Sequence, residues 1–320
     1  MLLVLAFRGQ NFEQLTSDLK SADYAWVFIS GLACLIAHVF RACRWQMLIK
    51  TLGYTTPSIL TTFYAVMIGY MANFALPRMG EITRCGVIKK SNNIPVNKLI
   101  GTVIIERLTD VFMLLIVIFL AVLLQFELIY EFLNQHVFSF IASKASGNWK
   151  WMIPMALVLV TAAILTLLKK KRTFDVPSKL IDLWQGLSNG LKSFYGLENK
   201  WGYLGYSILI WVFYYLSTYL CLFAITSTAD LGMLAALSIL VFGSLGMIVP
   251  VQGGIGAFHF MVAEGLVLYA VNKSDGLAYA TIIHSSQTLL VLVIGGLSLV
   301  LMLISSSKSK ANEPHRINTQ

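Results

Sequence analysis

The chain has 320 residues, of which 57% are hydrophobic and 12% are charged, and its mean hydropathy is +0.74. A water-soluble domain cannot bury that proportion of apolar surface, so the composition excludes a soluble protein and indicates an integral membrane protein. The net charge is +9. Because no basic stretch is interleaved with a soluble fold, we ascribe this charge to membrane orientation and to contact with anionic lipid heads, and we expect no nucleic-acid partner.

The first apolar stretch covers residues 1 to 7 and is too short to cross a bilayer, which takes about 20 residues. We expect either that the true start lies upstream or that this element is only partly embedded. The first full span is predicted over residues 24 to 40. A basic stretch at 41 to 57 follows and is expected to be cytoplasmic; it contains Arg41, Arg44 and Lys50.

The next apolar stretch, residues 58 to 76, is flanked by basic segments on both sides, and both cannot be cytoplasmic if it crosses once. Gly69, Asn73 and Pro77 weaken a straight helix here. Broken backbone at membrane depth is tolerated only where protein or a wet cavity covers it. We therefore predict a re-entrant or broken element.

Three charged residues, Arg78, Glu81 and Arg84, follow at a spacing of three, which places them on one side of a helical turn. Two guanidinium groups suit a phosphate because each offers paired donors, and Glu81 can hold one arginine in place. This pattern predicts a head-group site at the membrane boundary. The alternative is ordinary anchoring by positive charge on the cytoplasmic side.

Within the predicted span over 99 to 124, Glu106, Arg107 and Asp110 share one helical face and can pair. An unpaired charge at a helix centre costs roughly 2.5 to 3.5 kcal/mol on insertion scales, so these groups must pair and face inward. Two interpretations remain open. The cluster is either an internal salt bridge that locks helices together or a site for a polar head group or a proton.

Further spans are predicted over 151 to 168, 203 to 224, 232 to 249 and 277 to 304. Between the first two, an amphipathic helix over 179 to 195 is expected on the cytoplasmic surface, within a segment running from 174 to 200. Together with the earlier elements this predicts an all-α, polytopic bundle in one membrane domain over 1 to 310, with a cytoplasmic tail over 311 to 320.

The C-terminal half contains a second interrupted apolar stretch that breaks at Pro250 and continues through 255 to 271. Such breaks in both halves of a chain point to a transporter-like site near mid-membrane. The glycines allow backbone to approach a ligand or another helix closely. The residues that this pattern marks are Pro250, Gly253, Gly254 and Gly256, with Gln252, His259 and Glu264 as secondary candidates.

The four cysteines have no CxxC spacing, and no metal-ligand spacing or nucleophile with a base emerges. We expect reduced cysteines, no metal, no cofactor and no enzymatic activity.

Three segments, "GYMANFALPRMGEITRCGVI", "IIERLTDVF" and "PVQGGIGAFHF", together resemble the membrane region of bacterial lysylphosphatidylglycerol synthases and their stand-alone, flippase-like relatives. The resemblance covers roughly residues 12 to 303. It implies a polytopic bundle associated with moving a lipid between leaflets, and it marks Asn73, Pro77, Arg78, Gly80, Glu81, Arg84, Glu106, Arg107, Asp110, Pro250, Gly253, Gly254 and Gly256.

Two departures limit what the resemblance implies. The soluble aminoacyl-transferring domain of the full-length synthases is absent from the sequence, so lysine transfer is not implied. His259 stands where the family pattern carries a glutamate, which weakens a proton-coupling role there.

The sequence thus predicts a multi-pass protein of the bacterial plasma membrane, with a cytoplasmic C-terminus, that binds or translocates an anionic phospholipid or an isoprenoid-linked lipid. The alternative from another class is a non-transporting scaffold for an envelope-lipid or glycan enzyme. Partners expected besides lipid are a second copy of the chain or such an enzyme.

Overall fold

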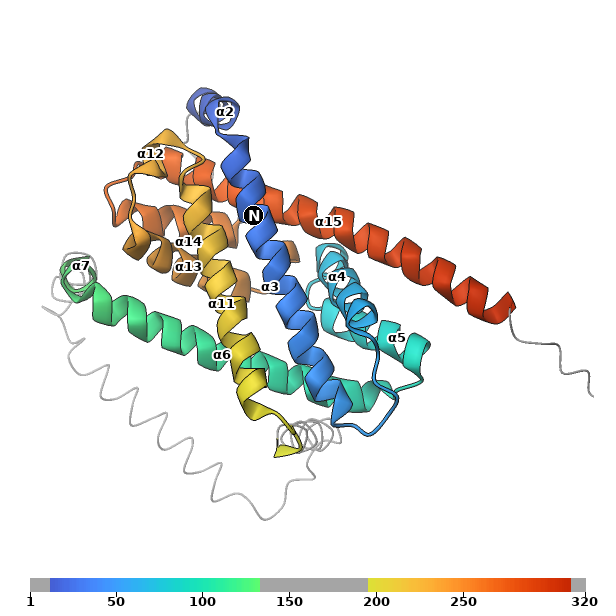
Figure 1. Ribbon diagram of the computed structural model, residues 1–320. Coiled ribbons are helices and arrows are strands. Elements are labelled where there is room, and N and C mark those ends of the chain that lie inside the picture. The colour runs from blue at the N-terminus through green and yellow to red at the C-terminus, as the bar shows by residue number, and fades with distance from the viewer. Residues whose placement is uncertain (1–11, 133–194, 312–320) are drawn as a thin grey trace, which may run out of the picture. The chain divides into compact units, whose positions relative to one another are not determined.

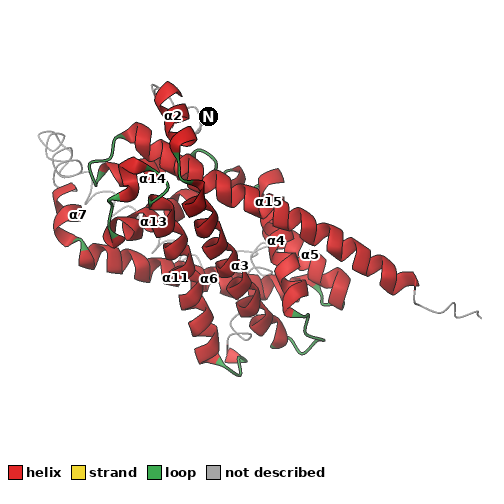
Figure 2. Cartoon of the chain, turned by 45° about the horizontal axis from the view of Figure 1, so that its top comes forward, coloured by secondary structure: helices red, strands yellow, loops and turns green. Residues whose placement is uncertain are grey.

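A computed structural model of the chain describes residues 12–132 and 195–311 (Figure 1). Every regular element in this described part is a helix, which confirms the all-α prediction (Figure 2). The helices are α2 (Phe12–Ser21), α3 (Tyr24–Lys50), α4 (Ile59–Ala75), α5 (Gly80–Asn92), α6 (Val96–Leu124), α7 (Phe126–Phe132), α11 (Lys200–Leu222), α12 (Thr226–Ala229), α13 (Met233–Ile248), the 3-10 turn η2 (Gln252–Gly254), α14 (Ala257–Val267) and α15 (Lys273–Ala311).

Of the described residues, 12–121 and 195–311 belong to one compact unit and 122–132 to another. The first unit holds all the elements described below. The predicted span at 151 to 168, the amphipathic helix at 179 to 195 and the tail after 311 lie wholly or almost wholly outside the described residues.

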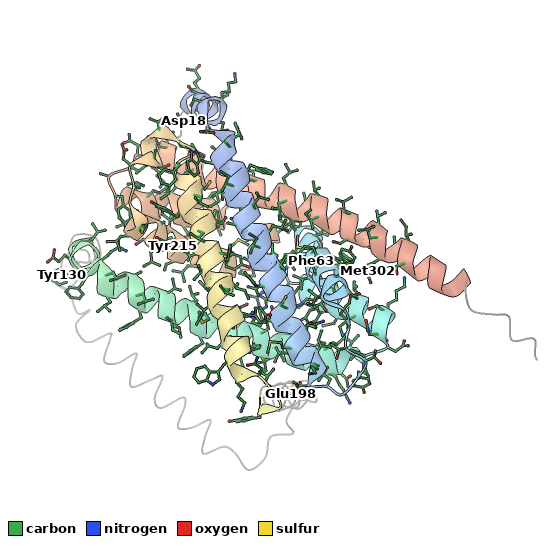
Figure 3. All side chains as sticks on the ribbon, viewed as in Figure 1. Asp18, Phe63, Tyr130, Glu198, Tyr215 and Met302 are labelled. Carbon is green, nitrogen blue, oxygen red and sulfur yellow. The ribbon has the colours of Figure 1, made fainter. Side chains whose placement is uncertain are left out.

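Among the helices of residues 12–132 and 195–311, four are long and apolar enough to cross a membrane, namely α3, α6, α11 and α15. Figure 3 shows side chains on both sides of the part of α15 that carries Met302. Many of the exposed side chains on α6 and α15 are large and apolar, for example those of Phe112, Phe119 and Leu297. These surfaces are suited to acyl chains rather than water.

The first span is longer than predicted, because α3 begins after the Asp23 cap and continues to Lys50. Asp23 accepts a hydrogen bond from the Ala25 N–H at 2.9 Å, which satisfies a free amide at the helix start. Arg41 and Arg44 therefore lie inside a helix and are 4% and 0% exposed. The prediction that the span ends at residue 40, before Arg41 and Arg44, is wrong. Hydropathy falls after residue 40, yet the helix continues because partners from other helices neutralise its charges.

Helices α4 and α5 form a helical hairpin. The turn between them spans 76 to 79, and α4 itself is unbroken to Ala75. At the open end the Asn92 side chain donates to the Thr55 carbonyl at 3.4 Å, so the chain returns to the side from which it came. This geometry removes the conflict between the two basic flanks of 58 to 76.

The hairpin is close because two glycines face each other. A methyl group added at Gly80 would collide with the Gly69 carbonyl oxygen and with the Asn73 side chain. Asn73 Oδ1 accepts the Gly80 N–H at 2.7 Å, which ties α4 to the first residue of α5.

A second helical hairpin follows in the other half, formed by α13 and α14. Its turn contains Gly253, Gly254 and Gly256 with φ of 57°, 77° and 87°, values that side chains with a Cβ rarely adopt. Near the open end, the Tyr269 hydroxyl donates to Ser238 Oγ at 2.8 Å. The predicted break after Pro250 is thus a turn between two short helices.

The turns of the two hairpins meet. Gln252 Nε2 donates to the Ala75 carbonyl at 3.4 Å, and Phe74 occupies the space where Gly253 lacks a side chain. His284 on α15 donates from Nε2 to the Gly253 carbonyl at 2.8 Å. The two breaks that the sequence indicated therefore lie against each other.

Candidate functional site: a buried arginine and carboxylate network

Two arginines of α3 face two carboxylates of α6. Arg41 Nη1 donates to Glu106 Oε1 at 2.8 Å and to Asp110 Oδ2 at 2.6 Å. Arg44 Nη2 donates to Asp110 Oδ1 at 2.7 Å. A spacing of three on α3 and four on α6 presents each pair on one face, so the two helices are joined by ion pairs at two successive levels.

Helix α11 lines the other side of this pair. Arg41 Nε donates to the Tyr214 hydroxyl and Arg44 Nη1 to Ser207 Oγ, at 3.4 and 3.3 Å. The Arg44 guanidinium also lies 5.8 Å from the centre of the Tyr203 ring. Polar groups of α11 thus supply acceptors that buried guanidinium groups require.

Arg84 enters the network from α5. Its Nη1 lies 2.9 Å from Glu106 Oε2, and its guanidinium lies 4.5 Å from the Trp45 ring centre. Trp45 is itself held by its indole N–H, which donates to Thr102 Oγ1 at 2.9 Å. Glu106, with a fully buried side chain, is therefore shared between Arg41 and Arg84.

Arg107 and Glu81 form the outer edge of the network. Their side chains are 41% and 31% exposed, and Arg107 Nε lies 3.6 Å from Glu81 Oε1. This separation is longer than a good hydrogen bond. Glu81 Oε2 and Arg107 Nε have no hydrogen-bond partner among the described residues, so the outer pair is incompletely made.

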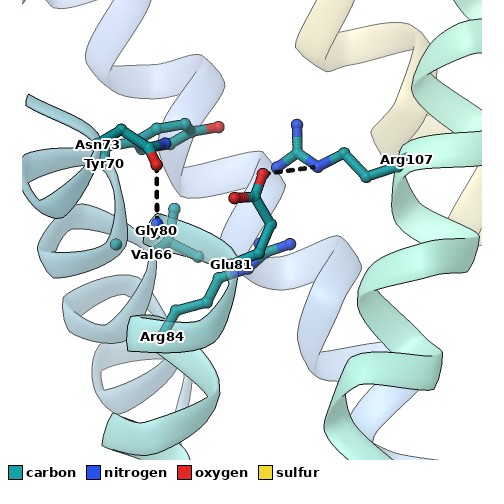
Figure 4. Close-up of a pocket in the computed structure, with 8 residues that line it drawn as sticks. Val66, Tyr70, Asn73, Gly80, Glu81, Arg84 and Arg107 are labelled. Atoms are coloured by element: carbon teal, nitrogen blue, oxygen red, sulfur yellow. Dashed lines mark hydrogen bonds and ion pairs between the residues drawn. The ribbon is translucent and has the colours of Figure 1, made fainter. Parts of the chain in front are cut away.

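A small pocket lies between the first hairpin and α6 (Figure 4). Its cavity volume is about 10 Å³, enough for roughly one water molecule. Figure 4 shows Glu81 and Arg107 facing each other across it, with Asn73 bound to Gly80 at one side. The residues that line it are Val66, Gly69, Tyr70, Asn73, Gly80, Glu81, Arg84 and Arg107.

Arg84 contributes two further unpaired donors to this pocket. The residue is 3% exposed, and its Nε and Nη2 have no acceptor among the described residues. Buried donors of this kind cost free energy unless they are paired. A pocket lined by such an arginine is chemically prepared for an anionic acceptor.

The buried charges do not cancel. Three arginines (41, 44 and 84) are at most 5% exposed, whereas only two carboxylates (106 and 110) lie with them. The interior set therefore carries one excess positive charge. In a low-dielectric interior an uncompensated charge is costly, which favours binding of one negative charge beside Arg84.

The network brings together most of the sequence-predicted site, namely Asn73, Glu81, Arg84, Glu106, Arg107 and Asp110. Arg78 does not join them. It is exposed in the turn after Pro77, with φ of 62°, because the chain has not yet entered α5 there. The expected one-sided arrangement of three residues thus reduces to Glu81 and Arg84.

The second-half candidates form a separate group around the other turn. His259 and His284 rings lie 4.9 Å apart, and the His259 ring accepts the Gly256 N–H at 3.4 Å. Glu264 pairs with Lys273 at 2.5 Å, both side chains partly exposed. These contacts organise the turn between α13 and α14 and do not reach the arginine network.

Sequence reasoning missed Arg41, Arg44 and Trp45. A signal was present in the sequence, because the apolar segment "MLI" at 47 to 49 comes soon after Arg41, Arg44 and Trp45. Apolar character that resumes after charged residues indicates that the helix continues. In the described part of the chain no three His, Cys, Asp or Glu side chains gather as metal ligands.

Comparisons with known proteins place this geometry in context. Residues 1–295 match the sequence model of the family described as "Lysylphosphatidylglycerol synthase TM region". The chain is also similar to the UPF0104 membrane protein MJ1595 of Methanocaldococcus jannaschii, with 26% identity over 113 residues. That match covers 34% of this chain and 33% of the relative, so the chain matches about a third of that protein's length. No solved structure matches.

Proposed function

Since this chain belongs to the lysylphosphatidylglycerol synthase transmembrane-region family, we propose that it binds the anionic, phosphate-bearing head group of a membrane lipid and moves it across the plasma membrane. The head group is bound at the pocket between the first hairpin and α6. The lipid is an anionic phospholipid or an isoprenoid-linked lipid, and the site binds and releases it without covalent chemistry.

The observation that carries this proposal is the state of Arg84. A nearly fully buried guanidinium with two unpaired nitrogens lines a pocket inside a membrane protein, and ionisable groups in that setting are costly unless they serve a ligand or an ion path. A phosphate offers the acceptors that Arg84 lacks.

The depth of the pocket supports a role in translocation. Glu81 lies eleven residues before the end of α5 at Asn92, or about 16 Å along the helix, in a hydrocarbon core about 30 Å thick. The pocket is therefore near mid-membrane. Broken elements that meet at such a depth are typical of transporters.

The orientation follows from the basic residues at the open end of the first hairpin. Lys50, Lys89, Lys90 and Lys98 lie outside the buried network near that end. By the positive-inside rule we propose that this end is cytoplasmic. The head group then enters toward Arg84 from the cytoplasmic leaflet, and we propose a cytoplasmic C-terminus.

The test is a flip assay with fluorescent phosphatidylglycerol in vesicles containing the purified protein. Arg84→Lys retains the charge that Glu106 needs but removes the paired donors. Movement of the labelled lipid is expected to fall at least about tenfold, the loss of one charge-assisted contact. Lys89→Ala on the exposed side of the same helix is the matched control. Unchanged lipid movement in folded Arg84→Lys would contradict the proposal.

A second candidate is a non-transporting scaffold for an envelope-lipid or glycan enzyme. One observation favours it: the network joins α3, α5, α6 and α11, as a purely structural lock would. Asp110→Asn separates the two. If the protein is a scaffold, Asp110→Asn loses thermal stability and a co-purified partner, and the wild type moves no lipid. If it is a translocase, the wild type moves lipid.

A further inference from the structure

We infer that Glu81 occupies the place of the ligand in the empty site, and that the pocket exchanges the Glu81 carboxylate for a singly charged phosphodiester. This inference rests on the proposed function, and it names both the charge class of the ligand and the residue that competes with it.

Glu81 is the weakest member of the network. Glu106 and Asp110 each contact an arginine at 2.9 Å or less. Glu81 Oε1 lies 3.6 Å from Arg107 Nε. Glu81 Oε2 and Glu106 Oε2 both have no hydrogen-bond partner among the described residues, but Glu106 Oε2 lies 2.9 Å from Arg84 Nη1. It is the carboxylate that a ligand can displace at least cost.

Glu81 also lies where a phosphate would be bound. It lines the pocket with Arg84 and Arg107, and Arg107 is the partner that the two anions would share. The pocket has room for about one water molecule while Glu81 points into it. A phosphate group is larger than that, so its entry requires the Glu81 side chain to move.

The Glu81 side chain can leave the pocket. The side chain is 31% exposed, and it lies in the first turn of α5, where a carboxylate is favoured by the helix dipole whether or not it is paired. Rotation of the Glu81 side chain out of the pocket therefore breaks only its 3.6 Å contact with Arg107. Glu106, with no exposure and two close arginines, has no such alternative.

The charge count selects the class of ligand. Exchange of the Glu81 carboxylate for a phosphodiester replaces one negative charge by one negative charge, so the network of four arginines (41, 44, 84 and 107) and three carboxylates (81, 106 and 110) keeps the one excess positive charge that it already has. Membrane phosphodiesters with one charge fit this requirement.

The test is a calorimetric titration of the full-length protein in detergent with dihexanoylphosphatidylglycerol, a singly charged diester lipid. Glu81→Gln removes the competing charge and keeps the size of the side chain. If Glu81 fills the site most of the time in the empty protein, Glu81→Gln should bind the probe about tenfold more tightly. Glu264→Gln, which neutralises a carboxylate of similar exposure beside Lys273, should leave the affinity unchanged.

Equal or weaker binding by Glu81→Gln overturns the inference; weaker binding would mean that Glu81 positions Arg107 or contacts a cationic part of the ligand. Glu81→Ala repeats the measurement if Glu81→Gln does not fold. Titration with glycerophosphoglycerol, the same diester without acyl chains, shows whether the site takes a lipid or a soluble ligand. Tighter binding of either probe by Glu81→Gln than by the wild type supports the exchange. If neither the wild type nor any variant binds the probe, the proposed function is overturned as well. If the wild type binds the probe and Arg84→Lys does not, the proposed function is retained even when Glu81→Gln shows no gain.

Discussion

Glu106 is the residue on which the buried charges depend. Its carboxylate, fully buried, lies within 2.9 Å of Arg41 and Arg84, which come from different helices. A buried ion pair contributes little net stability, but removal of one partner leaves charges that nothing compensates. Glu106 is therefore expected to be more sensitive to substitution than any exposed carboxylate of the chain.

We predict that Glu106→Gln lowers the free energy of unfolding by about 3 to 5 kcal/mol, because it leaves three buried arginines with one carboxylate. Thermal unfolding in detergent, followed by circular dichroism, measures this loss. Glu264→Gln should shift the midpoint far less, since its pair with Lys273 is partly exposed. Equal shifts for the two variants would show that the network is not effectively buried.

Trp45 acts on Arg84 rather than on a ligand, because its ring lies 4.5 Å from the guanidinium and outside the residues that line the pocket. We predict that Trp45→Leu weakens binding of dihexanoylphosphatidylglycerol several-fold, since Arg84 loses the surface that orients it. Trp45→Phe keeps a ring and should restore most of the affinity. Calorimetry checks both, and equal affinities for the two variants would exclude the positioning role.

At the scale of elements, the two interrupted apolar segments that the sequence predicted are helical hairpins. The first depends on contact between Gly69 and Gly80, and the second on three glycines with positive φ. These contacts explain why Gly69 and Gly80 lie on either side of Pro77 in the first segment, and why three glycines follow Pro250 in the second.

We predict that Gly80→Ala destabilises the first hairpin by about 1 to 3 kcal/mol, because the added methyl collides with the Gly69 carbonyl. Gly86 lies on the same helix with open space around it, so Gly86→Ala should be neutral or stabilise by up to about 1 kcal/mol. Unfolding midpoints of the two variants decide this. A loss of stability in Gly86→Ala as large as in Gly80→Ala would contradict the packing.

The sequence predicted the two breaks and the charged triad on α6, and it proposed Glu81 and Arg84 of α5 as head-group residues, because each is a local departure from apolar composition. It did not predict Arg41 and Arg44, since their partners come from residues 65 positions or more away. Hydropathy alone reads such arginines as the end of a span. Arg78 was included with Glu81 and Arg84 because the turn at 76 to 79 was taken as helix.

For the first unit of the molecule as a whole, the contact between the two hairpin turns matters most. Gln252 reaches the Ala75 carbonyl, and Phe74 fills the space above Gly253. If lipid passes between the turns, this contact must open in each cycle.

We predict that a short thiol cross-link between Ala75→Cys and Gln252→Cys stops lipid movement in vesicles, and that reductive release restores it. The variant carries the four native cysteines, so each single variant treated in the same way is the control. Movement that continues at the full rate in the cross-linked protein would exclude this path.

The most direct test is lipid mass spectrometry of the wild type and Arg84→Lys, each extracted in native nanodiscs from the same membranes. A phosphodiester lipid enriched over the bulk in the wild type, and returned to the bulk fraction in Arg84→Lys, is the predicted result. The same lipid composition around both proteins would contradict an anion site at Arg84.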